Sequence, residues 1–423
     1  MKRIITFCLL ITMIIFRTGL SSGQTPSGEI NAVRLGVSQI NITPEVPLIM
    51  SGYDARKTPF TGTHDDLYAS ALYFSDEKNK ALLITADLIG FRSGFVDEIK
   101  TGISLKTGIP IENIMITAVH NHGGPAIGTY EDKLPVANEN YIKLLKDKLI
   151  LLASDAAKNP VPFHIGIGKG NCNMNINRRA EFADGGIWLG RNPEGACDHE
   201  LDVVKFEDLN KKTLAVLINW PCHGTVSGQD NYQITGDWPG AAARYIRKQE
   251  DSAVIIGITA GASADINPIY GPGNDFNEVE AVGYHVGKEA WKTLAHTVTV
   301  PAISIQTVYT TITLPGKKAC KNQFPQASYE RGDDVEIKLA CIKIGDLVLC
   351  GISGELMTEI GMEIKKQSPF PQTIIITHCN GSSGYICTDN AFKEGGYEVK
   401  VTELMPGAEK PLISKMLELI NSF

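Results

Sequence analysis

Two histidines separated by one residue follow an apolar segment in the first third of the chain. Residues 116–119 (ITAV) lead into His120, Asn121 and His122, and a Gly-Gly-Pro turn comes next. Residues two apart on an extended backbone share one face, so both imidazoles can reach one site, as metal ligand and as acid or base. The alternative interpretation is two ordinary polar histidines at a strand end.

A histidine and a glutamate recur in a similar context, each after an apolar run. Residues 214–220 (LAVLINW) precede Pro-Cys and His223, and residues 348–352 (VLCGI) precede a Ser-Gly turn and Glu355. A lone histidine is more often structural, and the glutamate could complement a helix dipole. Zinc, however, takes three or four N, O or S ligands from such converging places and leaves one position for water. The segments together indicate a hydrolytic zinc site.

The elements that must position these residues alternate between β-rich runs and amphipathic segments, which predicts an α/β fold with mixed α+β layers. We expect strands at 35–42, 71–74, 81–89, 114–119, 164–167, 203–206, 214–220, 253–258, 303–314, 335–342 and 373–377. We expect helices at 138–158, 240–249, 277–295, 355–366 and 411–420. No repeat or low-complexity linker divides the sequence, so residues 24–423 are predicted to form one domain.

Composition and the amino terminus narrow the function further. The chain has 423 residues, 43% of them hydrophobic, and a net charge of -7 without Lys/Arg clusters, which excludes nucleic acid as the main partner. Met-Lys-Arg, an apolar run over 4–16 and small polar residues predict a signal peptide over 1–23, cleaved near Gly23 or Gln24. We therefore expect a periplasmic or secreted protein with no transmembrane segment in the mature chain.

Nine cysteines are present, and Cys8 would leave with the signal peptide. Cys341 and Cys350 flank an expected hairpin that turns at Gly345 and Asp346, and this register puts them directly opposite each other. The sequence leaves two interpretations open, a cross-strand disulfide and a pair of buried thiols.

The order of these motifs resembles the catalytic domain of the neutral/alkaline non-lysosomal ceramidase family, from about residue 37 to about residue 407. Its HTHSGP motif is similar to 119–125 (VHNHGGP), and its NFACHPT motif to 219–225 (NWPCHGT). Its GIH.RLYARA, SGD and PGE.T motifs are similar to 62–71 (GTHDDLYASA), 235–237 (TGD) and 353–358 (SGELMT). A late Gly-Tyr followed by Tyr-Glu matches 384–385 and 397–398, and its INRSP motif resembles 175–179 (NINRR).

This resemblance implies a set of functional residues, carried over position by position. One zinc ion per chain would be held by His120, His223, Glu355 and Tyr385. The implied catalytic residues, which would lie beside the attacking water and the scissile carbonyl, are His122, Tyr397 and Arg178.

One departure concerns the mechanism. Where the family has an active-site serine in Gly-Asp-x-Ser-Pro, residues 264–268 read ADINP, so Asn267 replaces the hydroxyl. Ser263 is near in sequence, but four residues earlier it need not point the same way. We therefore expect direct attack by a metal-activated water, with Asn267 as a hydrogen-bonding catalytic residue.

Other departures concern the substrate. The chain ends soon after the last motif, without the C-terminal β-sandwich domain that follows in full-length ceramidases, and Trp220 and Pro221 replace small residues. The first expectation is zinc-dependent hydrolysis of an N-acyl amide, with a ceramide-like lipid, reached at a membrane surface, as the first candidate. The alternatives are deacylation of a non-lipid substrate such as an acylated glycan, and a non-catalytic binding protein on the same scaffold.

Overall fold

The computed structural model describes residues 33–129 and 133–423, which belong to one compact unit. The expected signal peptide over 1–23, with its cleavage site, lies outside the described residues. Within the described part of the chain, no helix is long and apolar enough to cross a membrane.

A nine-stranded sheet is the largest element of the fold, in the order β12-β10-β9-β6-β1-β3-β4-β5 with β14 paired to β6. Its strands are β1 (Arg34–Asn41), β3 (Tyr68–Ser75), β4 (Lys80–Ala86), β5 (Ile114–Ala118), β6 (Val161–Asn171), β9 (Glu200–Asp208), β10 (Thr213–Trp220), β12 (Ile255–Ala260) and β14 (Val300–Pro301). Most pairs are antiparallel, but β4 with β5 and β10 with β12 are parallel. The sheet curls until Ser70 Oγ of β3 donates to the carbonyl of Ile256 in β12 at 3.2 Å.

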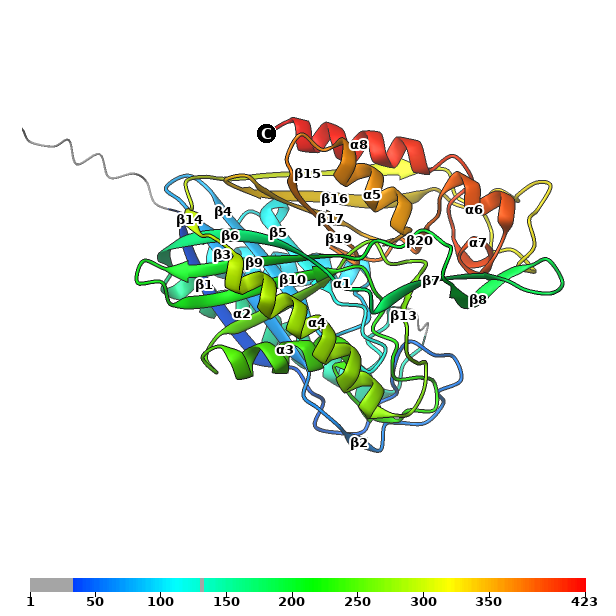
Figure 1. Ribbon diagram of the computed structural model, residues 1–423, viewed down its shortest axis with the longest axis horizontal. Helices are drawn as coiled ribbons and strands as arrows, with labels where there is room; N and C mark the ends of the chain where they lie inside the picture. Colours follow the sequence, from blue (N-terminus) through cyan, green and yellow to red (C-terminus); the bar gives the residue numbers. More distant parts are fainter. Residues whose placement is uncertain (1–32, 130–132) are drawn as a thin grey trace, which may run out of the picture. The chain divides into compact units, whose positions relative to one another are not determined.

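A four-stranded sheet in the order β15-β16-β17-β19 packs against the large one. Its strands are β15 (Ile305–Leu314), β16 (Val335–Ile344), β17 (Leu347–Ile352) and β19 (Gln372–Ile376). One apolar cluster joins the two sheets, with Leu83 and Phe206 from the large sheet and Ile342 and Leu349 from the small one. Strands β16 and β17 are buried almost throughout because α5 (Thr358–Gln367) and α8 (Glu409–Asn421) cover their other face (Figure 1).

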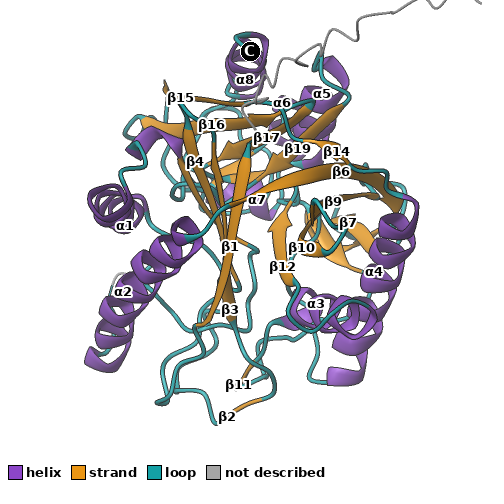
Figure 2. Cartoon of the chain, turned by 90° about the vertical axis from the view of Figure 1, so that its left-hand side faces the viewer, coloured by secondary structure: helices purple, strands orange, loops and turns teal. Residues whose placement is uncertain are grey.

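Four more helices cover the outer face of the large sheet (Figure 2). Helices α1 (Ser93–Thr107) and α2 (Val136–Lys158) lie over its β1-β3-β4-β5 half, and α3 (Asp237–Gln249) and α4 (Phe276–His296) over the β9-β10-β12 half. Contact is closest at Gly36 of β1, where an added Cβ would lie 1.8 Å from the carbonyl oxygen of Ala156. A glycine is therefore needed for α2 to seat on the sheet.

Short elements connect the layers near one end of both sheets. They are β2 (Gly62–Thr63), β7 (Asn175–Glu181), β8 (Ile187–Asn192), β11 (Gln233–Ile234), β13 (Ile266–Pro268), β18 (Glu355–Leu356), β20 (Tyr385–Ile386), α6 (Asp389–Glu394) and α7 (Tyr397–Val401). The short 3-10 helix η1 (Ile111–Asn113) directly precedes β5, at the other end of that strand. Strands β13, β7 and β8 form a three-stranded sheet, and β18 pairs with β20 in parallel.

The α/β fold class is confirmed, and the strands and helices expected from sequence correspond to observed elements, mostly within a few residues. One boundary was wrong: the helix expected at 355–366 begins at Thr358, and Glu355 lies in β18. Cys341 and Cys350 do face each other across β16 and β17. They are buried free thiols with Sγ atoms 3.7 Å apart.

Candidate metal centre

Four ligand-type side chains enter one site from loops that follow parallel strand pairs. His120 follows β5, His223 follows β10, and Glu355 and His378 follow the paired strands β17 and β19. The carboxyl ends of parallel strands in α/β folds commonly form ligand sites. These residues are spread over 258 positions of the sequence, and the two facing sheets bring them together.

The backbone fixes the orientation of three imidazoles. The Nδ1 atoms of His120, His122 and His223 lie 2.7, 3.1 and 3.0 Å from the carbonyl oxygens of Ile89, Gly52 and Ile266. A carbonyl can only accept, so each Nδ1 carries the proton and each Nε2 presents a lone pair. This arrangement is typical of metal-binding histidines, whose second nitrogen donates to a carbonyl or carboxylate.

The lone pairs converge on each other. His122 Nε2 lies 3.2 Å from His120 Nε2, and Glu355 Oε2 lies 3.5 Å from His120 Nε2 and 3.6 Å from His223 Nε2. Two sets of donor atoms lie within 4.8 Å of one another, His120 with His122 and His223, and His120 with Glu355 and His378. Facing lone pairs repel unless a cation lies between them, so the donor set fits a bound metal.

Electrostatics keep the donors in the forms that a metal needs. Burial lowers the pKa of His120 and His122 well below the usual value, aided by the other histidines of the site. Burial therefore keeps these imidazoles neutral, which is the protonation state that binds a metal.

Strained backbone accompanies these side chains. His120 and His378 have positive φ angles of 61° and 52°, as do Asp237 (51°) and Asn380 (63°) in the surrounding loops. Such conformations cost energy in non-glycine residues and concentrate at functional sites. Hydrogen bonds compensate here: for example, the Asn380 side chain accepts from Ile116 N in β5 at 3.0 Å.

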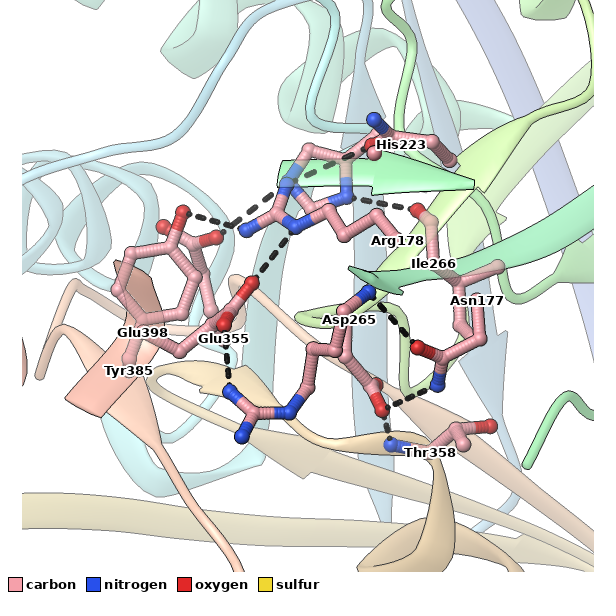
Figure 3. A network of polar contacts seen from close by, with 12 residues as sticks. Asn177, Arg178, His223, Asp265, Ile266, Glu355, Thr358, Tyr385 and Glu398 are labelled. Atoms are coloured by element: carbon pink, nitrogen blue, oxygen red, sulfur yellow. Dashed lines mark hydrogen bonds and ion pairs between the residues drawn. The ribbon is translucent and has the colours of Figure 1, made fainter. Parts of the chain in front are cut away.

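Arg178 organises the part of the site beside His223. The pairing of β7 with β8 shifts register between Asn177 and Arg179, so two residues of β8 face Arg178 in a β-bulge, a feature common next to active sites. Its Nη1 donates to His223 Nε2 at 3.1 Å and its Nε to Glu398 Oε1 at 2.8 Å (Figure 3). Burial opposes the charge, but Tyr385 and Glu398 raise the pKa of Arg178, which stays cationic.

The remaining expected site residues also contact Arg178. Its Nη2 donates to Tyr385 Oη at 3.3 Å and its Nη1 to Asn267 Oδ1 at 3.4 Å. The guanidinium carbon lies 5.7 Å from the ring centroids of both Tyr385 and Tyr397. Burial, followed by the Glu355 carboxylate, raises the pKa of Tyr397, so its phenol keeps its proton. Arg178 thus brings all of the tyrosine and asparagine positions into one cluster.

Asp265 ties three segments together beneath Arg178. Its Oδ2 accepts from Asn177 Nδ2 at 3.0 Å and its Oδ1 from Thr358 N at 2.9 Å, while its backbone oxygen accepts from Arg178 N (Figure 3). Ser263 is 1% exposed, and its hydroxyl has no hydrogen-bond partner among the described residues. A buried hydroxyl of this kind is poorly placed to form an acyl-enzyme.

Two residues of the site were missed in the sequence. The His378 ring stacks on His120, with centroids 4.0 Å apart at 11°. Burial lowers the pKa of His378 to about 4. The sequence pattern could have identified His378, because it directly follows the expected strand 373–377, and the other histidines of the site also follow expected strands. Arg56 is buried and donates to the carbonyls of Ser51, His122 and Gly228, which clamps the His122 loop; its sequence context gives no such signal.

The early motif at 62–71 supports this loop from behind. Asp65 Oδ2 accepts from Thr235 Oγ1 at 2.6 Å, and its Oδ1 accepts from Gly236 N at 2.9 Å. The carbonyl of Thr235 in turn accepts from Asn121 Nδ2 at 2.7 Å, between the two histidines. Three separated motifs are therefore one hydrogen-bonded unit, which explains why they occur together.

Comparison with known proteins agrees with this geometry. The solved neutral ceramidase from Pseudomonas aeruginosa is similar with a TM-score of 0.78 at 16% identity, over 92% of this chain and 74% of that one. A ceramidase solved in complex with C2 gives 0.80 at 16% identity, over 92% and 75%. At this identity the two structures establish the fold. The sequence family described as neutral/alkaline non-lysosomal ceramidase, N-terminal, matches residues 33–270, more than half of the chain. The chain therefore belongs to the neutral/alkaline non-lysosomal ceramidase family.

Proposed function

We propose that this protein is a zinc-dependent hydrolase that cleaves an N-acyl amide bond, with a ceramide-like lipid as its first candidate substrate. The observation that carries the proposal is the convergence of imidazole lone pairs and the Glu355 carboxylate beside the Arg178 cluster. Membership of a family of hydrolases and the names of the two similar structures support the reaction class.

The donors suit zinc in particular. Neutral imidazoles with a carboxylate, and a tyrosine nearby, are nitrogen and oxygen ligands of the kind found in catalytic zinc sites, whereas magnesium and calcium favour oxygen alone. We assign the ligands as His120, His223, Glu355 and Tyr385. Zinc bound there would lower the pKa of a water molecule toward about 7 and polarise the substrate carbonyl.

The other residues would move protons and orient the substrate. We assign proton transfer to His122, because it is half-buried whereas His120 and His223 are almost fully buried, and its Nε2 faces the site. The protonated phenol of Tyr397 and the cation of Arg178 can donate to the oxygen that gains charge as the carbonyl is attacked. Arg178 holds Asn267 by its amide oxygen, so the amide nitrogen is the group that it offers to a substrate.

The test is hydrolysis by purified, zinc-loaded protein of N-acyl sphingoid amides and of short N-acyl amino sugars, in water enriched in oxygen-18. We expect release of the amine and one heavy oxygen in the carboxylate product, with loss of turnover on chelation and recovery with zinc. Preference for the amino sugars would identify a glycan deacylase. A fully loaded protein that hydrolyses neither class would contradict the proposal and favour a binding protein.

A further inference from the structure

The β7–β8 hairpin begins at the metal centre and extends away from it. Arg178 lies in its bulge at the base, and the turn over residues 182–186 forms the far end beside α7 (Figure 1). Ala180 and Trp188 are paired across the strands, so their side chains share one face. The hairpin therefore provides a surface that starts at the reacting groups.

Aromatic rings form a continuous path from the site onto this hairpin. The Tyr385 and Tyr397 rings meet edge to face, with centroids 5.8 Å apart at 80°. Tyr397 meets Trp188 in the same way, at 5.6 Å and 86°. All three residues are half-buried, so each ring is accessible on part of its surface. The phenolic oxygen of Tyr385 accepts a hydrogen bond from Arg178 Nη2, so the path begins at the Arg178 cluster.

The path continues to the hairpin turn. Phe182 lies two residues beyond Ala180, on the face of Trp188, and is 49% exposed. Gly190 keeps this face open, because a Cβ there would lie 2.7 Å from Ala180 Cβ and 3.7 Å from the Phe182 ring. The exposed apolar surface thus adjoins the rings of the site.

One more apolar side chain borders the far end of the hairpin. Phe324, from the loop between β15 and β16, is 39% exposed. Phe324 reaches the turn, since a Cβ at Gly186 would lie 2.9 Å from its ring. Isolated apolar residues on a surface are ordinary, but a contiguous strip that leads into a reaction centre indicates a binding site.

We propose that this strip, Tyr397, Trp188 and Phe182, binds the extended apolar chain attached to the scissile carbonyl, an assignment that rests on the proposed function. A chain fixed at one end in the site lies first against Tyr397, then against Trp188 and Phe182. A lipid surface is the less suitable occupant, because the exposed carboxylates of Glu181 and Asp184 flank Phe182 and disfavour anionic headgroups.

Binding of saturated fatty acids of increasing length, each kept monomeric, tests this assignment without requiring turnover. In the full zinc-loaded protein we expect Kd to fall about fourfold per added methylene until the strip is filled. Trp188→Ala and Phe182→Ser should each reduce the gain in affinity per added methylene for the longer chains. Leu105→Ser on α1, at a position 84% exposed, is the matched control and should keep it. Phe182 is exposed, so the Phe182→Ser variant should fold and test the role of the strip even if Trp188→Ala folds poorly.

Three outcomes would overturn the assignment. The wild-type affinity could be independent of chain length, or both variants could keep the wild-type dependence of Kd on chain length. Binding could also be detected only with vesicles of anionic lipid and not with monomeric fatty acids. The last outcome would identify a lipid surface as the occupant. The same length series of N-acyl amides, measured as kcat/KM, should show the same dependence. If no amide is hydrolysed, the proposed function fails while the fatty-acid series still decides the role of the strip.

Discussion

At the scale of single residues, the histidines differ in what surrounds them. His120 stacks on His378 and lies against Glu355. His223 accepts a hydrogen bond from Arg178. His122 instead packs edge to face against the Tyr53 ring, with centroids 5.2 Å apart. The Nδ1 atoms of His120, His122 and His223 are each held by a backbone carbonyl. These contacts alone therefore do not tell which histidine is a metal ligand and which is an acid or base. The half-buried His122 is therefore the one for which we propose proton transfer.

His122→Ala should retain most of the bound zinc and lose about 10²–10⁴-fold in turnover, the usual contribution of a positioned acid or base. His223→Ala should lose zinc and activity together, because it removes an assigned ligand. Zinc content by elemental analysis, measured beside kcat for both variants, checks the distinction. Equal loss of zinc in the two variants would make His122 a ligand.

Asn267→Ser should change rate or substrate preference by about 1–3 kcal/mol, the scale of one active-site polar contact, and leave the reaction unchanged. Asn267→Ala should cause a partial loss of similar size, because Arg178 then loses one acceptor. Kinetics on one substrate, with mass spectrometry for an acyl-enzyme, provide the check. A trapped acyl group on Ser263, or activity that appears only with serine at 267, would refute direct attack by water.

The sequence predicts much of this residue set. His120, His122, His223 and Glu355 each follow an apolar strand-like run, which is a local pattern. The grouping of Tyr385, Tyr397 and Arg178 came only from the family resemblance, since nothing in their spacing predicts contact. His378 shares the strand-then-histidine pattern and was overlooked, while Arg56 could not be found because it binds backbone carbonyls, two of them in distant loops.

At the scale of elements, the buried ion pairs between β7 and α7 hold the arginine side of the site. Glu398 is 1% exposed and accepts from Arg178 Nε at 2.8 Å and from Arg179 Nη1 at 2.9 Å. Arg179 also bonds Glu394 at 3.0 Å, but that carboxylate is 44% exposed. The two glutamates are therefore a matched pair that differ in burial.

Glu398→Gln should lower the free energy of unfolding by about 3–5 kcal/mol, because it leaves the buried Arg178 without its carboxylate and Arg179 with only the exposed Glu394. Glu394→Gln, the control, should change it by less than about 1 kcal/mol, as for a solvent-screened pair. Urea unfolding monitored by circular dichroism measures both. Similar small effects from the two variants would show that α7 does not depend on this pair.

Element prediction succeeded where the pattern was long. The helix expected at 138–158 is α2, which repeats a helical period over many residues, and the strand expected at 214–220 is β10, which is a long apolar run. Strands β13, β18 and β20 have two or three residues and no period, and their pairing is decided by distant segments. These short pieces carry Asn267, Glu355 and Tyr385, so the precise positions in the site depend on tertiary contacts.

At the scale of the whole molecule, the large sheet buries a carboxylate that has no close ion-pair partner among the described residues. Asp202 in β9 is 2% exposed, one of its oxygens has no hydrogen bond within the described ranges, and Lys169 Nζ lies 4.0 Å away. Burial, followed by the neighbouring Glu200, raises the pKa of Asp202 to about 7. The folded protein therefore binds this proton more tightly than the unfolded chain.

The stability that this proton provides is fully present below the unfolded pKa of about 3.9 and is lost as the pH rises through about 7. Asp202→Asn should remove this part of the pH dependence and stabilise the protein above pH 7, by at most about 4 kcal/mol at about 1.4 kcal/mol per pKa unit. Asp155→Asn on the exposed face of α2 is the control. The measurement is the free energy of unfolding of both variants across that pH range. The same pH dependence in the two variants would contradict this account.

Anomalous diffraction from crystals of the purified protein at the zinc absorption edge tests the central claim most directly. The account predicts one zinc peak per chain, about 2.0–2.2 Å from His120 Nε2, His223 Nε2, a Glu355 oxygen and Tyr385 Oη, with His122 outside that distance. Absence of a peak in protein purified without chelators and supplied with zinc, or a peak bound by other residues, would contradict it.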